Sequence, residues 1–493
     1  MAHRAVPLHV AYAKAPHGWT ADAEKKSRAG VGESTTTTPL DSPRHPDKAY
    51  LHLPDEILLE IISYLDPKNF AYDYGKAEKQ RDLHAFSLVN SQWNAIATPV
   101  LYFSPRLEGS HYDKFTRTIC PSINLNVRKS PLSSFVRELD LSLLVHQGSK
   151  STTARLLGRT KERLQTFTAP QASFSLNCYP ALSKCHALKK LDLSLVSEIS
   201  SLKTLFEVTA GLESLKDFDL PRSSGFGNNI NPATIKWPPN LDSLGLSGGL
   251  SSQFWTGQFH LPAGLMTVSI THCPKFDDDC LHAFFLTLIS SDCIICHLAF
   301  AHLPLLQSDS LDCVLDMFPF LLTLEVSVDY VTPEVLNPAE ARIDPTSARY
   351  LSDGEEYYSG SEEDEVHLET SDQPDHENRA ENVSVPSDGD LIPNKQRRRK
   401  PRLRSIVKLE HLELSDSGER DNTEKIEPLD VLMYADDYGM VPRLVRVAVA
   451  KSLNWTGENL EGDCDALDDW LVENARARNP PGEEWWSGVR TFG

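Results

Sequence analysis

The residues with the clearest potential for chemistry are two cysteines at metal-binding spacing, Cys293 and Cys296, followed directly by His297. A Cys-x-x-Cys pair can supply two ligands of a tetrahedral zinc site, which needs two more. The other cysteines nearby stand at irregular distances, and this pair lies around an apolar stretch rich in Ile and Leu. We therefore predict that both cysteines pack in a core and hold no metal.

Other patterns of catalytic groups are missing from the sequence. It contains no Gly-rich phosphate loop, no His-Glu-x-x-His pair and no nucleophile elbow. The histidines are scattered, without a partner acid or base nearby in the chain. We expect a non-catalytic protein without a cofactor, so its function must lie in what its elements bind.

Composition places further limits on those partners. The chain of 493 residues is long enough for two or more units, and its formal charge is −20. Residues 340–390 hold 16 acidic side chains and 3 arginines, a local −13 that leaves about −7 for the remainder. No apolar run approaches the roughly 18–20 residues that span a bilayer, so we expect no membrane partner. Nine irregularly spaced cysteines indicate reduced thiols and a location in the nucleus or cytoplasm.

Two helical patterns follow a polar arm, residues 1–48, that we expect to be disordered. In "LHLPDEILLEIISYLD" the apolar residues recur at helical spacing, and Pro54 suits the first helical position. A second pattern begins near Arg81, and we expect the residues before it, "AYDYGKAEKQR", to form a surface loop. A unit of about fifty residues buries too little surface to be stable alone, so part of its apolar face is predicted to meet another protein.

The pattern of residues 49–104 resembles an F-box. In that family a Leu-Pro pair opens the first helix, and Leu-Val followed four residues later by Trp marks the last. The resemblance implies docking onto a Skp-family adaptor of a cullin–RING ubiquitin ligase. The residues that match the pattern, and that it implies contact the adaptor, are Leu53, Pro54, Ile57, Ile61, Leu65, Leu88, Val89 and Trp93.

Beyond residue 105 the chain repeats the pattern Leu-x-x-Leu-x-Leu. Successive middle positions are separated by 28, 24, 27, 26, 24, 30 and 26 residues, a period typical of leucine-rich repeats. These middle positions are Leu139, Phe167, Leu191, Phe218, Leu244, Val268, Leu298 and Leu324. We predict an α/β fold in which residues 105–337 form a solenoid with short parallel strands inside and helices outside. Any single repeat could be an ordinary buried strand, but the regular spacing of eight favours the solenoid over the alternative of another α/β layer fold.

One repeat stands apart from the others. Leu412 in "LEHLEL" is the middle of a further repeat, 88 residues after Leu324. Subtracting one ordinary step of 26 leaves 62, close to the length of the acidic segment 338–404. We predict that this segment is a disordered insertion between two adjacent repeats. Residues 405–420 then supply the final repeat strand, and residues 421–493 a helical cap that closes the solenoid.

The residue between the last two apolar anchors of each repeat should point out from the concave face of the solenoid. Five of these nine positions are acidic and none is basic. The acidic positions, which are our candidates for contacting a target protein, are Asp140, Asp192, Asp219, Glu325 and Glu413. Either they form a docking stripe for a basic partner, or they only keep an exposed face solvated.

A basic cluster, "KQRRRKPRLR", closes the acidic insertion. A cluster of this kind in a flexible segment is typical of a nuclear-import signal or a nucleic-acid patch. No aromatic residues are interleaved, which counts against nucleic acid. The alternative is that the cluster neutralises the acidic segment. The residues that we assign to import are Lys395, Arg397, Arg398, Arg399 and Lys400.

The resemblance to an F-box, taken together with the repeats, implies the substrate-recognition subunit of an SCF-type ubiquitin ligase. The helices would hold the adaptor and the solenoid would hold an unknown protein substrate. A second hypothesis is a nuclear leucine-rich-repeat scaffold that binds a basic partner and has no role in degradation.

Overall fold

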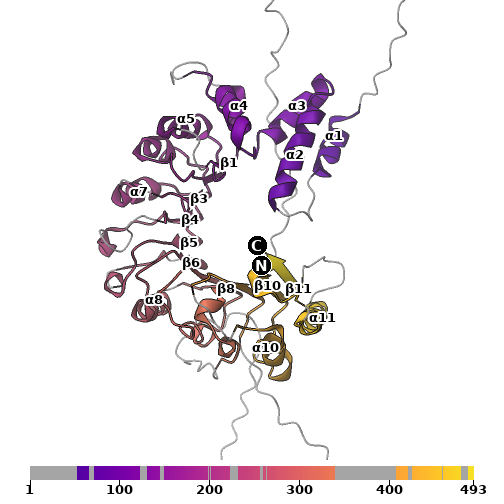
Figure 1. Ribbon diagram of the computed structural model, residues 1–493. Coiled ribbons are helices and arrows are strands. Elements are labelled where there is room, and N and C mark those ends of the chain that lie inside the picture. The colour runs from indigo at the N-terminus through magenta and orange to yellow at the C-terminus, as the bar shows by residue number, and fades with distance from the viewer. Residues whose placement is uncertain are drawn as a thin grey trace, which may run out of the picture. The chain divides into compact units, whose positions relative to one another are not determined.

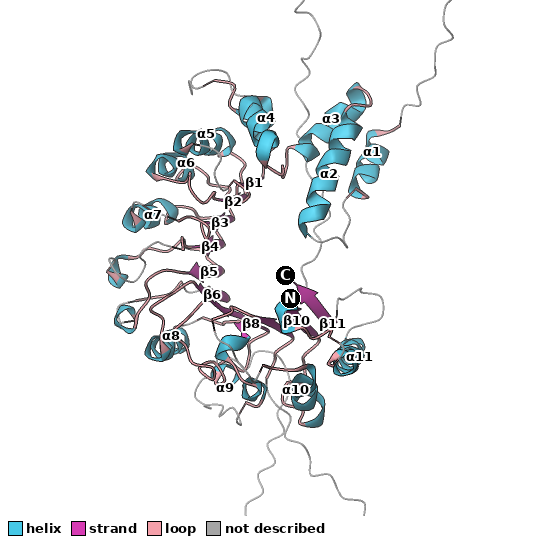
Figure 2. Cartoon of the chain, in the orientation of Figure 1, coloured by secondary structure: helices cyan, strands magenta, loops and turns pink. Residues whose placement is uncertain are grey.

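The computed structural model describes residues 53–65, 72–122, 130–144, 149–197, 199, 201–222, 231–255, 259–262, 264–291, 293–338, 407–419, 425–457, 459–478 and 487–492. The predicted arm, the acidic insertion and the basic cluster lie outside these residues. Figures 1 and 2 show the helices of the N-terminal part, followed by a solenoid with its strands along the inner side and its helices along the outer side. The predicted fold class is confirmed.

From residue 138 onward an α-helix separates successive strands, except after β4, β5 and β8, where the described residues form only 3-10 helices. The helices are α1 (Asp55–Ser63), α2 (Tyr72–Ser87), α3 (Ser91–Leu101), α4 (Gly109–Ile119), α5 (Lys150–Thr160), α6 (Tyr179–Leu182), α7 (Leu202–Thr209), α8 (Asp278–Ser290), α9 (Val314–Met317), α10 (Pro428–Leu432) and α11 (Glu461–Arg478). The strands are β1 (Glu138–Asp140), β2 (Thr166–Thr168), β3 (Lys190–Asp192), β4 (Asp217–Asp219), β5 (Ser243–Leu246), β6 (Thr267–Thr271), β7 (His297–Ala301), β8 (Thr323–Ser327), β9 (His411–Ser415), β10 (Arg446–Ala450) and β11 (Gly488–Phe492).

All of these strands pair in parallel and in chain order, in one sheet. The predicted middle residue of each repeat lies opposite the middle residue of the next, from Leu139 to Leu324, and each is buried. Capping side chains start several outer helices: Ser149, Ser201 and Asp277 each accept a hydrogen bond from the backbone N–H three residues later. The repeat pattern thus fixes both the strand register and the core.

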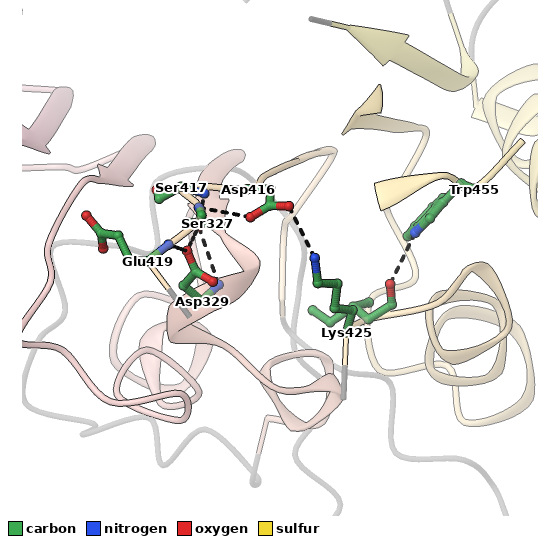
Figure 3. A network of polar contacts seen from close by, with 9 residues as sticks. Ser327, Asp329, Asp416, Ser417, Glu419, Lys425 and Trp455 are labelled. Atoms are coloured by element: carbon green, nitrogen blue, oxygen red, sulfur yellow. Dashed lines mark hydrogen bonds and ion pairs between the residues drawn. The ribbon is translucent and has the colours of Figure 1, made fainter. Parts of the chain in front are cut away.

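The predicted join across the insertion is confirmed. Leu324 of β8 lies opposite Leu412 of β9, so residues 88 apart in the chain are neighbours in the sheet. Just beyond this join, side chains on one flank of the insertion bind backbone groups on the other in a polar clasp, which we define as Ser327, Asp329, Ser417 and Glu419 (Figure 3). The Ser417 N–H donates to Ser327 Oγ at 3.0 Å, and the Glu419 N–H donates to Asp329 Oδ2 at 3.2 Å.

The C-terminal part differs from the prediction. Strand β9 is not the final strand, because β10 and β11 continue the same sheet beyond it. Residues 421–493 therefore extend the solenoid with strands as well as helices, and are not only a helical cap. Trp455 is buried there and donates from Nε1 to the Ile426 carbonyl at 3.1 Å (Figure 3).

The N-terminal helices also differ from the prediction. The second helix begins at Tyr72, so residues 72–80 are helical and not a surface loop. It ends at Ser87, and α3 starts after a break at residues 88–90. Asn90 caps α3 by accepting a hydrogen bond from the Trp93 N–H at 3.0 Å.

Because β8 and β9 are neighbours in one sheet, we predict that they contribute equally to one core. Leu324→Ala and Leu412→Ala should each lower the free energy of unfolding by about 2–5 kcal/mol, because both side chains are fully buried. Leu305→Ala, at an exposed position, should change it by less than about 1 kcal/mol. Urea unfolding of the three variants checks this, and a Leu412→Ala variant as stable as Leu305→Ala would contradict it.

Candidate functional site

Helix α1 has two apolar sides. Leu58 and Ile62 are buried against the neighbouring helices, whereas Ile57 is 48 % and Ile61 37 % exposed. The apolar residues that recur at helical spacing in this segment are therefore divided between the fold and solvent. Of the other matched residues of this segment, Leu53 and Leu65 are half-buried and Pro54 is exposed.

The turn between α2 and α3 exposes two more apolar side chains. Leu88 is 70 % and Val89 57 % exposed, in the break between the two helices and just before Asn90, which caps α3. Trp93, by contrast, is half-buried, and its ring lies 4.2 Å from that of Phe86, measured between centroids. Trp93 therefore contributes to the packing of α2 against α3.

Helices α1 and α3 pack together, and a polar contact joins the first turn of one to the first turn of the other. Gln92 Nε2 donates to Asp55 Oδ1 at 2.7 Å, which holds the first turn of α3 beside the first turn of α1. We define the exposed apolar surface of this part as Ile57, Ile61, Leu88 and Val89. Exposed apolar side chains gathered on two neighbouring elements favour the binding of another protein.

The concave face of the solenoid carries the second candidate surface. The register places the five acidic candidates in one row across the strands, together with Thr168, Gly245, Ser269 and Ala299. The row is not evenly acidic: Asp192 lies opposite Asp219, and Glu325 opposite Glu413, but small neutral residues separate the two pairs. We call these the β3–β4 pair and the β8–β9 pair.

The members of the row have different surroundings. Asp140 accepts hydrogen bonds at Oδ1 from the N–H and hydroxyl of Ser142, and Asp192 accepts the same two bonds from Ser194. Burial, and then the charge of Asp192, raises the pKa of Asp219 to about 6. A Cβ atom at Gly245 would lie 2.2 Å from Asp219 Oδ1, so this glycine leaves the room that the Asp219 side chain occupies.

Sequence reasoning missed a parallel row two residues earlier in each strand. In this row His297, Thr323, His411 and Arg446 follow one another across β7–β10. His297 Nε2 lies 2.8 Å from Glu325 Oε1, and burial, followed by Arg446 and His297, lowers the pKa of His411 to about 4. The β8–β9 pair is therefore bordered by imidazole and guanidinium groups. The second variable position of the repeat pattern was the signal that could have found them.

The prediction that both cysteines of the metal-binding spacing pack in a core is confirmed for Cys293 and wrong for Cys296. Cys293 is buried and donates to the Pro262 carbonyl at 3.1 Å, whereas Cys296 is only partly buried, just before β7. Across the part of the chain that the structure describes, no three His, Cys, Asp or Glu side chains gather as a metal site would require. Within the same residues, no helix has the length and apolar character to cross a membrane.

Comparison with known proteins defines the class of the N-terminal part. Residues 50–108 match the family model described as F-box-like. The chain thus combines an F-box-like domain, containing α1–α3, with a solenoid of leucine-rich-repeat character.

Two relatives extend the similarity beyond that domain. The chain is 33 % identical to F-box protein YDR306C of Saccharomyces cerevisiae over 296 residues, which are 58 % of this chain and 59 % of the relative. It is 29 % identical to Protein pof5 of Schizosaccharomyces pombe over 264 residues, which are 53 % of this chain and 70 % of that protein. The chain therefore spans about three-fifths of the length of the first relative.

Solved structures add little to this. An internalin of Listeria monocytogenes matches with 12 % identity and a TM-score of 0.25, over 45 % of this chain and 65 % of the internalin. The repeat architecture of the present chain rests on its own strand register.

The raised pKa of Asp219 predicts a specific dependence of stability on pH. An aspartate has a pKa near 4 in an unfolded chain, so the folded state binds this proton more tightly. Its contribution to stability is complete below about pH 4 and is lost as the pH rises through about 6. Asp219→Asn should therefore be more stable than the wild type at pH 7, by about 1–2 kcal/mol, and equal to it near pH 4.

Urea unfolding at both pH values measures this difference. Asp140→Asn is the matched control, because Asp140 belongs to the same row and its carboxylate accepts two hydrogen bonds from Ser142. An Asp219→Asn variant that follows the wild type at both pH values would contradict the prediction.

Proposed function

We propose that this chain is the substrate-recognition subunit of an SCF-type cullin–RING ubiquitin ligase. The F-box-like domain binds a Skp-type adaptor, and the solenoid binds a target protein. Ubiquitin transfer takes place on other subunits, and this chain contributes binding and geometry. Holding the target near the transfer site raises its effective concentration without a catalytic side chain here.

The observation that carries the proposal is the exposed apolar surface of the F-box-like domain. Its four side chains belong to the matched family segment, and each is at least 37 % exposed. Covering one such side chain with a partner contributes on the order of 1 kcal/mol. The buried residues of the same helices, such as Leu58 and Leu83, hold the fold and leave this surface available.

The concave face supports the second half of the proposal. The β3–β4 and β8–β9 pairs place negative charge at two places on one face, with a neutral stretch between them. A target with basic side chains would match this face, and its binding would weaken as salt screens the charges.

The basic cluster at residues 395–400 supports a proposal about location. We assign it to nuclear import, so that the chain works in the nucleus, in the cytoplasm, or in both. Replacing Lys395, Arg397, Arg398, Arg399 and Lys400 by Ala in a fluorescently tagged chain tests this, and an unchanged nuclear fraction would contradict it.

Adaptor binding is tested on the exposed apolar surface. Leu88→Asp/Val89→Asp should weaken co-purification with a Skp-type adaptor at least tenfold, because charge replaces side chains that the adaptor would bury. Leu286→Asp/Ile289→Asp on α8 is the matched control, since these side chains are 50 % and 53 % exposed on the solenoid. The control should bind the adaptor like the wild type. Equal binding by both double variants would contradict the proposal.

The same purification separates the ligase from the alternative scaffold. A ligase subunit recruits the cullin through the adaptor, whereas a scaffold does not. We expect the cullin to appear with the wild type and to be lost together with the adaptor in Leu88→Asp/Val89→Asp.

A further inference from the structure

The solenoid has a regular backbone ladder that begins inside the F-box-like segment. At each step from β1 to β10, one carbonyl accepts hydrogen bonds from two successive N–H groups of the next repeat. For example, the Arg137 carbonyl accepts from Gln165 and Thr166, at 2.7 and 3.0 Å. The Phe103 carbonyl, just after α3, accepts from Arg137 and Glu138 in the same way, both at 3.0 Å. Phe103 therefore takes the place of a preceding repeat.

A side-chain contact strengthens this start of the ladder. Ser104 Oγ donates to Glu138 Oε2 at 2.6 Å. Glu138 is thus bound to the residue next to Phe103. The last residues of the F-box-like segment are joined to β1 by both main chain and side chain.

A second contact binds the same segment to α2. The Gln80 amide pairs with the backbone of Arg106: the Arg106 N–H donates to Gln80 Oε1 at 2.6 Å, and Gln80 Nε2 donates to the Arg106 carbonyl at 3.3 Å. The Arg106 side chain is largely buried and pairs with Glu108, 3.0 Å away. Two hydrogen bonds to one backbone unit fix both the position and the orientation of the segment.

Gln80 lies in the part of α2 that was expected to be a loop. The exposed apolar surface is on α1 and the turn at residues 88–90, and the buried residues among the described side chains of α2 are Leu83, Phe86 and Ser87. The additional helical residues before Arg81 bring Gln80 to Arg106. Through Gln80 these residues contact the segment that starts the ladder.

We propose that Gln80 is a positioning residue, which braces the F-box-like helices against the first step of the solenoid through Arg106. Its consequence for ubiquitin transfer rests on the proposed function, because a fixed joint holds a bound target at a set place relative to the adaptor. The joint itself is a property of this chain alone.

The test compares full-length Gln80→Ala and Gln80→Glu with His84→Ala, an exposed position one turn further along α2. Hydrogen exchange at the Arg106 amide reports the bond directly. Loss of one partly buried hydrogen bond should speed exchange about fivefold to tenfold in Gln80→Ala. Gln80→Glu keeps an acceptor for this N–H and should restore most of the protection, whereas His84→Ala should match the wild type.

Spin-label distances report the positioning role. Labels at Ala95→Cys on α3 and Glu207→Cys on α7 use two exposed sites, in a chain whose accessible Cys296 and Cys313 are replaced by Ser. We expect a distance distribution at least twice as wide in Gln80→Ala as in the wild type or His84→Ala, with Gln80→Glu between them. If Gln80→Ala does not fold, the same two measurements on Gln80→Glu and His84→Ala test the proposal.

Two results would overturn the proposal: an Arg106 amide that stays protected in Gln80→Ala, or an unchanged distance distribution. Broadening by His84→Ala would also overturn it, because the effect would then not belong to Gln80. Co-purification with the Skp-type adaptor is measured on the same proteins. Failure of the wild type to bind the adaptor would reject the proposed function. Hydrogen exchange at Arg106 and the spin-label distances would still test the positioning role of Gln80.

Discussion

The structure depends on one constraint: no repeat can bury its apolar row alone. Each strand has three to five residues, and about two of their side chains point into the core. This is far too few to form a core of its own. Stacking the next repeat covers these side chains and pairs the backbone. The ladder from Phe103 onward and the core from Leu139 onward are therefore two results of the same stacking. The outer helices can vary widely in length because they do not set the register.

This constraint explains what could be predicted from the sequence. The spacing of leucines fixes the register, since slipping one strand by a residue would turn its apolar row to solvent. The pairing of Leu324 with Leu412 across 88 residues could be predicted for the same reason. Strands β10 and β11 were missed because the steps to Val447 and Val489 are 35 and 42 residues, outside the earlier period. The alternating valines of "RVAVA" were nevertheless a strand signal.

The candidate surfaces were predicted less well, for a different physical reason. Helical periodicity shows which residues of α1 are apolar, but it does not show which of two apolar sides meets the rest of the fold. Only packing separates buried Leu58 from exposed Ile57. On the concave face the strand pattern locates the acidic row but not the surroundings of each carboxylate. The space that Gly245 leaves beside Asp219 depends on strands adjacent in the sheet.

The polar clasp has a consequence for the integrity of the chain. Strands β8 and β9 pair over five residues, from Thr323 with His411 to Ser327 with Ser415, and the clasp joins the segments just beyond them. None of these contacts needs a covalent connection through residues 339–406. A single proteolytic cut in that stretch would leave two fragments that remain associated and separate only in denaturant. In such a nicked molecule the F-box-like domain and strands β9–β11 would still belong to one particle.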